Sequence, residues 1–199
     1  MRLPDLKSRL RGVAVEARDL ARDAKNSLRL KSSLLAAKRR GDIRKRLAGL
    51  ETLLESARDA NVLDLGCFDG LITYEFFRSG AKLVHGLDND ALHLETAGRI
   101  FGQAGIPSRF VHADLRKPGA IGRALRGHGL QTYDIVLFLG VFQHIYSSMD
   151  ARRRNDLVAD IVARTGSLLA VRMPQDVWGE FERLLPAREF EVVRAVPQA

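Results

Sequence analysis

The segment 61–70, NVLDLGCFDG, joins an apolar strand-like stretch to an acid and a loop bracketed by two glycines. Asp64 stands near the end of the expected strand, and Gly66 and Gly70 flank the loop that leads into the expected helix LITYEFF. Glycine takes backbone conformations closed to other residues and lets a ligand approach the chain closely. Free N–H groups at the start of a helix favour polar or negative groups of a ligand. The segment therefore predicts a pocket for a polar small molecule.

The loop narrows the choice of ligand. Phe68 stands where the dinucleotide fingerprint G-x-G-x-x-G has its second glycine, and Asp69 would lie close to a pyrophosphate. The phosphate-binding pattern G-x-x-x-x-G-K-[ST] does not occur in the sequence. A nicotinamide-dependent oxidoreductase is therefore disfavoured. A cofactor with an ammonium group and little negative charge fits better, and S-adenosylmethionine has these properties.

Further acids follow in the order that this cofactor needs. The stretch KLVHGLD ends in Asp88, and SRFVHADL contains Asp114 near its end. An acid at the end of the second strand can accept hydrogen bonds from both ribose hydroxyls, as in dinucleotide-binding folds. An acid after the third strand can accept one from the adenine amino group. A fourth apolar stretch then runs from Tyr133 to Gly140.

The series DLGCFDG, GLDND, HADL and YDIVLFLGVFQHI resembles the motifs of class I S-adenosylmethionine-dependent methyltransferases, over about residues 60–172. The resemblance implies an α/β fold, a doubly wound, mostly parallel sheet with helices on both faces, and S-adenosylhomocysteine as the product. Many members have a glycine where Phe68 stands, so the ring is expected to narrow the approach to the methionine portion. The implied cofactor-binding residues are Asp64, Gly66, Cys67, Phe68, Gly70, Asp88, Asn89, Asp114, Leu115 and Gly140.

The acceptor is expected beside the stretch 140–146, after the fourth strand. His144 is a candidate catalytic base, since a neutral imidazole takes up a proton near pH 7. The alternative is that His144 only shapes the pocket, and Tyr146 is a second candidate. FLGVF differs from the Asn/Asp-Pro-Pro-Tyr/Phe pattern of enzymes that methylate exocyclic or amide nitrogens. No cysteine follows the fourth strand, which disfavours a covalent mechanism at pyrimidine C5. No metal site is expected. The predicted acceptor atom is oxygen, nitrogen or carbon on a small or amphiphilic molecule.

Basic residues are concentrated in the first part of the chain. The net charge is +8, and residues 1–46 contain 15 Lys and Arg against 5 Asp and Glu, a balance of +10. An apolar repeat from Leu3 to Ala24 at spacings of three and four predicts a helix. Such a basic helix could pack on the body or on a second copy, lie on an anionic membrane, or contact nucleic-acid phosphates. We expect residues 1–58 to form a basic helical arm or cap, and residues 59–199 the methyltransferase domain.

The remaining elements alternate between strand and helix, which predicts a parallel sheet. A helical run from Ile43 to Ala57, with Asp42 as its N-cap, should pack on the sheet before the first strand. Expected strands cover 61–65, 82–88, 108–112, 133–139, 167–172 and 188–196, with a helix in DVWGEFERLL.

The sequence also bounds the setting of the protein. No apolar run is long enough to span a membrane, no secretory leader is evident, and Cys67 is the single cysteine. These features favour the cytoplasm, with peripheral membrane association as a second expectation. Two rival functions remain: a binding or scaffold protein that keeps the fold without catalysis, and an RNA-directed methyltransferase that uses the basic arm.

Overall fold

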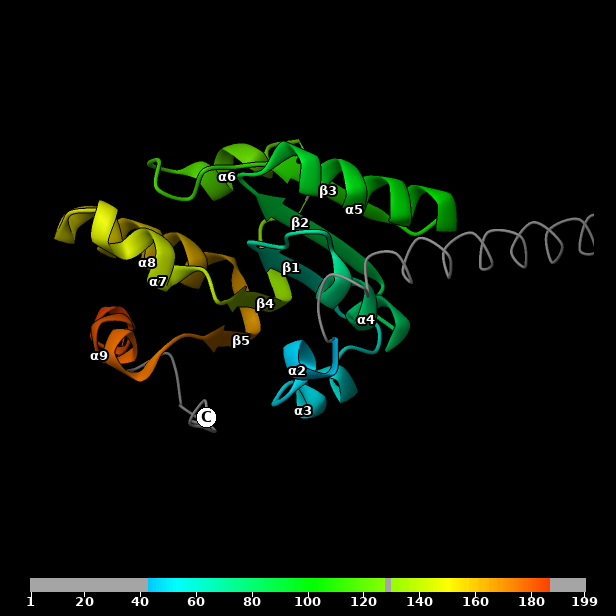
Figure 1. The fold of residues 1–199 in the computed structure, drawn as a ribbon, viewed down its shortest axis with the longest axis horizontal. Coiled ribbons are helices and arrows are strands. Elements are labelled where there is room, and N and C mark those ends of the chain that lie inside the picture. The colour runs from blue at the N-terminus through cyan, green and yellow to red at the C-terminus, as the bar shows by residue number, and fades with distance from the viewer. Residues whose placement is uncertain (1–42, 128–129, 187–199) are drawn as a thin grey trace, which may run out of the picture.

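Among the residues that the structure describes, the core is a five-stranded sheet, in which every strand pair is parallel. The computed structural model describes residues 43–127 and 130–186 (Figure 1). The strand order is β3-β2-β1-β4-β5, so that β1 lies between β2 and β4. Parallel strands that reverse their order in this way leave a crevice at their carboxyl ends. The strands are β1 (Asn61–Leu65), β2 (Leu83–Asp88), β3 (Ser108–His112), β4 (Tyr133–Leu139) and β5 (Thr165–Arg172).

Helices cover both faces of the sheet, because successive strand residues point to opposite sides. On β1, Val62 belongs to one buried cluster and Leu63 to another. The Val62 cluster contains side chains of α4 (Leu71–Arg78) and α5 (Ala91–Ala104), and those of α2 (Ile43–Leu47) and α3 (Glu51–Glu55) pack against it. The Leu63 cluster contains residues of the helices on the other face, namely α6 (Ala120–Ala124), α7 (Phe142–Ile145), α8 (Ala151–Arg164) and α9 (Gln175–Leu184). The short helix η1 (Tyr146–Ser148) follows α7.

The structure confirms the α/β fold and the five strands expected between residues 61 and 172, with β5 beginning two residues earlier than predicted. The predicted helix from Ile43 to Ala57 is wrong as a single element. It is divided into α2 and α3 at Gly49, whose φ is +81°. A left-handed glycine ends a helix because its carbonyl ladder cannot continue through that conformation. Leu50 and Ala57 are nevertheless buried in the cluster of β1, so this segment packs on the sheet as expected.

Several expectations concern residues outside the described ranges. These are the basic helix from Leu3 to Ala24, the N-cap at Asp42 and the last strand at 188–196. Within the described residues, no helix is both long enough and apolar enough to cross a bilayer.

Candidate cofactor-binding site

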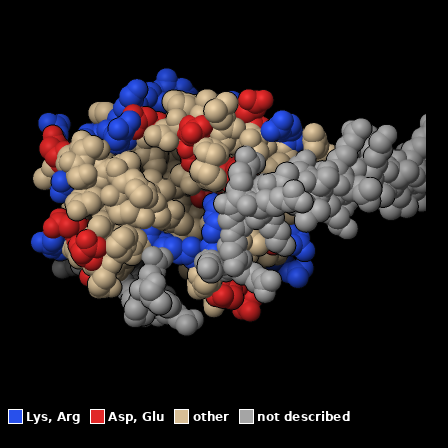
Figure 2. Space-filling model, viewed as in Figure 1, with Lys and Arg blue, Asp and Glu red and all other residues tan. Residues whose placement is uncertain are grey.

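A cavity of about 610 Å³ opens at the carboxyl ends of β1, β2, β3 and β4. Figure 2 shows a hollow on this face of the molecule, with acidic side chains above it and basic ones along its lower edge. Its volume lies within the range usual for small-molecule sites. The described residues that line it are Arg46, Gly66, Phe68, Asp88, Asn89, Asp90, His93, Ala113, Asp114, Leu115, Leu139, Gly140, Val141, His144 and Ile145.

The glycine loop forms the floor between β1 and β4. Gly66 has φ +84°, and a Cβ atom built on it would lie 2.2 Å from Cγ2 of Val141. Only glycine can therefore stand at position 66 without moving the neighbouring loop. Phe68 has φ +54°, so it keeps the left-handed backbone that glycine favours at this point of the loop. A bulky side chain thus stands in a turn conformation that glycine favours.

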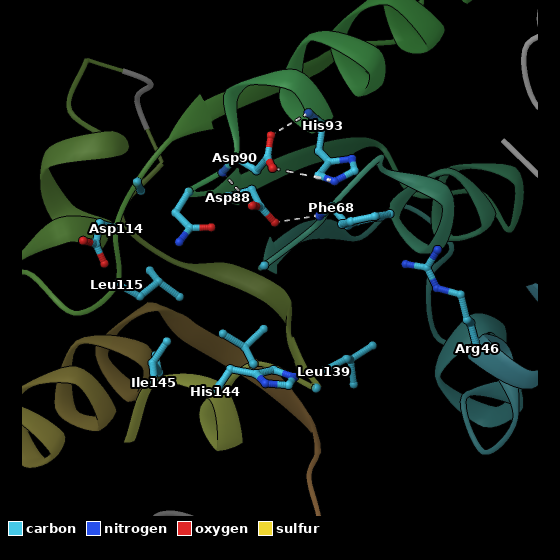
Figure 3. Close-up of a pocket in the computed structure, with 15 residues that line it drawn as sticks. Arg46, Phe68, Asp88, Asp90, His93, Asp114, Leu115, Leu139, His144 and Ile145 are labelled. Carbon is cyan, nitrogen blue, oxygen red and sulfur yellow. Dashed lines mark hydrogen bonds and ion pairs between the residues drawn. The ribbon is translucent and has the colours of Figure 1, made fainter. Parts of the chain in front are cut away.

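Asp88, at the end of β2, is the best-placed hydrogen-bond acceptor in the cavity (Figure 3). Its Oδ2 accepts from the backbone N–H of Phe68 at 2.8 Å, and its Oδ1 accepts from that of Asp90 at 2.9 Å. A carboxylate has about four acceptor positions. Because only two are taken by these backbone groups, Asp88 can accept two further hydrogen bonds from a ligand.

Asp114 lies at the end of the cavity formed by the loop after β3, and Arg116 holds it in place. Nε and Nη2 of Arg116 donate to the two carboxylate oxygens at 2.8 and 2.9 Å. The hydrogen bond from Arg116 lowers the pKa of Asp114, so this carboxyl is charged at neutral pH. Oδ1 also accepts from the backbone N–H of Arg116 at 3.1 Å, so Oδ2 is the oxygen that retains a lone pair for a ligand. The pairing with Arg116 was not predicted from the sequence.

The ring of Phe68 packs away from the floor of the cavity, against α5. Its centroid lies 3.5 Å from that of His93, and the guanidinium of Arg46 lies 5.6 Å from it. Phe68 is 38% exposed at the mouth of the cavity. The ring therefore forms a side wall of the cavity, where it is stacked on His93.

The opposite wall comes from β4 and α7 and is mainly apolar. In Figure 3, Leu139, His144 and Ile145 face the acids across the cavity. The His144 side chain is exposed, and its backbone N–H donates to the carbonyl of Val141 at 2.9 Å. An imidazole thus stands alone among hydrophobic side chains on this wall.

Four of the predicted site residues do not line the cavity. Asp64 is buried, and its Oδ2 accepts a hydrogen bond from the Thr73 hydroxyl at 2.6 Å. Cys67 is buried too, and burial raises the pKa of its thiol. Gly70 is the left-handed N-cap of α4. Tyr146 packs against Phe142 and beneath Arg154, away from the cavity.

Asp64 makes stability depend on pH. Burial raises the pKa of its carboxyl to about 6 from 3.8, while the Thr73 hydrogen bond and the charge of Arg46 act in the opposite direction. A raised pKa in the folded state means that stability is greatest below about pH 4 and falls as pH rises to about 6, by up to about 3 kcal/mol.

We therefore expect Asp64→Asn to gain stability relative to wild type across this pH range, since the amide cannot ionise and still offers an oxygen to Thr73. Urea unfolding at several pH values between 4 and 7 measures the difference. A difference that is independent of pH would contradict the assignment.

Sequence reasoning missed several lining residues, namely Arg46, Asp90, His93, Ala113 and Leu139. Asp90 was part of the quoted motif GLDND, and its position one residue before α5 marks it as the cap whose carboxylate accepts from Leu92 and His93 N–H groups. The position of His93 follows from that of Asp90, because His93 lies on the first turn of α5. Arg46 carried no such signal, since its position depends on the packing of α2 against the end of β5.

The sequence matches no protein-family model and no curated protein. Solved structures do match. They include a TehB-like SAM-dependent methyltransferase from Corynebacterium glutamicum (TM-score 0.50, 21% identity, covering 77% of this chain and 80% of that one). The bifunctional kinase-methyltransferase WbdD matches with TM-score 0.53 and 20% identity over 75% of this chain and 33% of its own. A putative RNA methyltransferase, PH1948 from Pyrococcus horikoshii, matches with TM-score 0.50 and 17% identity over 72% of this chain and 64% of its own.

The chain therefore has the fold of the class I S-adenosylmethionine-dependent methyltransferases. It spans less than two thirds of the length of WbdD and of the PH1948 protein. At these identities the likeness establishes the fold alone.

Proposed function

We propose that this protein is an S-adenosylmethionine-dependent methyltransferase that acts on an oxygen, nitrogen or carbon atom of a small or amphiphilic molecule. The observation that carries the proposal is the convergence of four strand ends, those of β1, β2, β3 and β4, on one cavity. A glycine that cannot be replaced, Gly66, lies on its floor, and the carboxylates of Asp88 and Asp114 lie along one side.

The chain offers a partner for each part of the cofactor. Asp88 has two free acceptor positions for the ribose hydroxyls, and Asp114 with Leu115 borders the place for the adenine. Gly66 and Gly140 leave room for the methionine portion between β1 and β4. When bound, the sulfonium of the cofactor supplies an activated methyl group. What remains for the protein is to align the acceptor and to remove its proton.

The apolar wall is suited to bind the methyl acceptor, and His144 is placed to accept the proton that the acceptor loses. The side chains of Leu139, Val141 and Ile145 would contact a hydrophobic part of the acceptor. A neutral His144 could accept a proton from an attacking hydroxyl, amine or carbon acid. An amphiphilic acceptor, with a hydrophobic part for this wall and one nucleophilic group near His144, fits this arrangement best.

Calorimetric titration with S-adenosylhomocysteine tests the proposal. We expect one molecule to bind per chain with a Kd in the micromolar range, and NAD to give no comparable heat, because the loop lacks the glycines that admit a pyrophosphate. Tight binding of NAD without binding of S-adenosylhomocysteine would favour an oxidoreductase instead. Methyl transfer is then followed with labelled cofactor against pools of small metabolites and lipids.

A scaffold function is the second candidate, and Phe68 is the observation that favours it. A bulky ring stands on the cofactor loop in a left-handed conformation, which costs a non-glycine residue about 1–2 kcal/mol. A chain that binds the cofactor but transfers no methyl group to any acceptor pool would support this candidate.

An RNA acceptor, reached through the basic residues 1–46, is distinguished by adding transfer and ribosomal RNA to the pools.

A further inference from the structure

Arg153 joins the first turn of α8 to the loop that follows β3. Its Nε donates to the carbonyl oxygen of Arg116 at 2.9 Å, and its Nη2 makes a longer hydrogen bond of 3.4 Å to that of Leu115. The side chain is 16% exposed, and its Nη1 lies 3.7 Å from Oδ2 of Asp156, beyond hydrogen-bond distance. Hydrogen bonds that a guanidinium donates are stronger than those between neutral groups. A largely buried cation therefore holds two successive carbonyl groups of this loop.

The loop that Arg153 holds forms one end of the cavity. Figure 3 shows Asp114 and Leu115 next to each other at that end. Arg116 connects them to Arg153, because its backbone N–H and its Nε both donate to Oδ1 of Asp114 while its carbonyl oxygen accepts from Arg153. A shift of this backbone would therefore move the Asp114 carboxylate and Leu115 together.

The helix α8 gives Arg153 a fixed starting point. Asp150 caps this helix, and its Oδ1 accepts from the backbone N–H of Arg153 at 2.7 Å. Leu157 and Val158, one turn further on, are buried in the core. The loop 113–119 lies between β3 and α6 and belongs to neither element. Arg153 thus extends from a well-packed helix to a segment that has no strand or helix of its own.

We propose that Arg153 is a positioning residue for the recognition of adenine, and that it acts by fixing Asp114 at the end of the cavity. The inference rests on the proposed function, which places the adenine of the cofactor beside Asp114 and Leu115. Oδ2 of Asp114 has a lone pair for the amino group of the base, so a displaced loop loses this hydrogen bond. Arg153 does not line the cavity itself and acts through the loop.

The preference for adenine over hypoxanthine separates this role from a general effect on stability. S-adenosylhomocysteine has an amino group on its base, whereas S-inosylhomocysteine has a carbonyl oxygen there, which an ionised Asp114 would repel. For the wild type we expect the Kd of S-inosylhomocysteine to be about tenfold to a hundredfold higher, as for one hydrogen bond to a charged group. For Arg153→Met we expect this ratio to fall to about threefold or less, chiefly because S-adenosylhomocysteine binds more weakly. Calorimetry with each ligand measures the ratio.

Arg154→Met is the matched control on the neighbouring residue. Nε of Arg154 donates to the carbonyl oxygens of Tyr146 and Met149 at 2.9 and 3.1 Å, so this side chain holds η1 rather than the loop after β3. We expect Arg154→Met to lower the free energy of unfolding and to keep the full preference for adenine. Arg153→Lys should give an intermediate ratio, since an ammonium group can reach one of the two carbonyl oxygens. This variant also supplies the ratio where Arg153→Met does not fold.

A double substitution tests whether Arg153 acts through Asp114. In the Asp114→Ala background, Arg153→Met should not change the ratio further, because the carboxylate that it positions is gone. If Arg153→Met lowered the ratio by the same factor in both backgrounds, Arg153 would act by another route and the positioning role would be overturned.

The remaining outcomes also decide the question. An unchanged ratio in both Arg153 variants would overturn the assignment, even if the two ligands bound more weakly overall. Equal binding of the two ligands by the wild type would overturn it as well, because Asp114 would then not distinguish the bases. Both results leave the proposed function in place. If the wild type binds neither ligand, the proposed function itself has failed.

Discussion

Asp88→Ala is expected to raise the Kd of S-adenosylhomocysteine by a hundredfold or more. Two hydrogen bonds from ribose hydroxyls to a carboxylate are together worth about 3–6 kcal/mol, and 1.4 kcal/mol is a factor of ten. The substitution also leaves the backbone N–H groups of Phe68 and Asp90 without their acceptor, so the loop loses the carboxylate that joins it to the end of β2. Calorimetry with the purified variant measures the loss.

Asp134→Ala is the matched control for this experiment. Asp134 also stands on a strand of the sheet, and its Oδ2 accepts from the backbone N–H of Asn61 at 2.7 Å. It lies at the start of β4, at the opposite end of the sheet from the cavity. We expect the control to lower the free energy of unfolding and to leave the Kd unchanged. If both variants bound the ligand like the wild type, Asp88 would have no role in binding.

The strand ends were predictable because their signals are local. A buried parallel strand is recognised as a run of Val, Ile and Leu. An acid at its end lies at the carboxyl end of the sheet, whatever the packing of the helices. Asp88 and Asp114 therefore line the cavity as the sequence suggests. Asp64 illustrates the limit of the same reasoning. It lies inside β1 rather than beyond it, so its side chain is enclosed and accepts from Thr73.

The position of Arg46 could not be predicted, because it depends on a tertiary contact with Arg172 across more than a hundred residues of sequence. Nothing in the basic run of residues 1–46 distinguishes Arg46 from its neighbours. The break at Gly49 was missed for a related reason. The apolar spacing from Leu47 to Leu54 fits one continuous helix, and only the packing of α3 beside the sheet selects the left-handed glycine.

Gly66→Ala is expected to abolish measurable cofactor binding and to lower the free energy of unfolding by about 2–4 kcal/mol. The added Cβ would lie 2.2 Å from Cγ2 of Val141, whose β-branched side chain has few rotamers to escape into, and φ +84° is strained for alanine. The loop or the start of α7 must shift, and both border the cavity. Urea unfolding gives the stability, and calorimetry with S-adenosylhomocysteine gives the affinity.

Two further variants separate the causes of this loss. Val141→Ala in the Gly66→Ala background removes the clashing methyl group, so part of the stability should return while the backbone strain remains. Gly98→Ala adds a Cβ in open space on α5, and it should stabilise the protein by about 0.5–1 kcal/mol without changing the affinity. Gly66→Ala could instead bind S-adenosylhomocysteine as tightly as Gly98→Ala does. In that case the ligand does not approach the backbone at the loop between β1 and α4, and the proposed cofactor site is wrong.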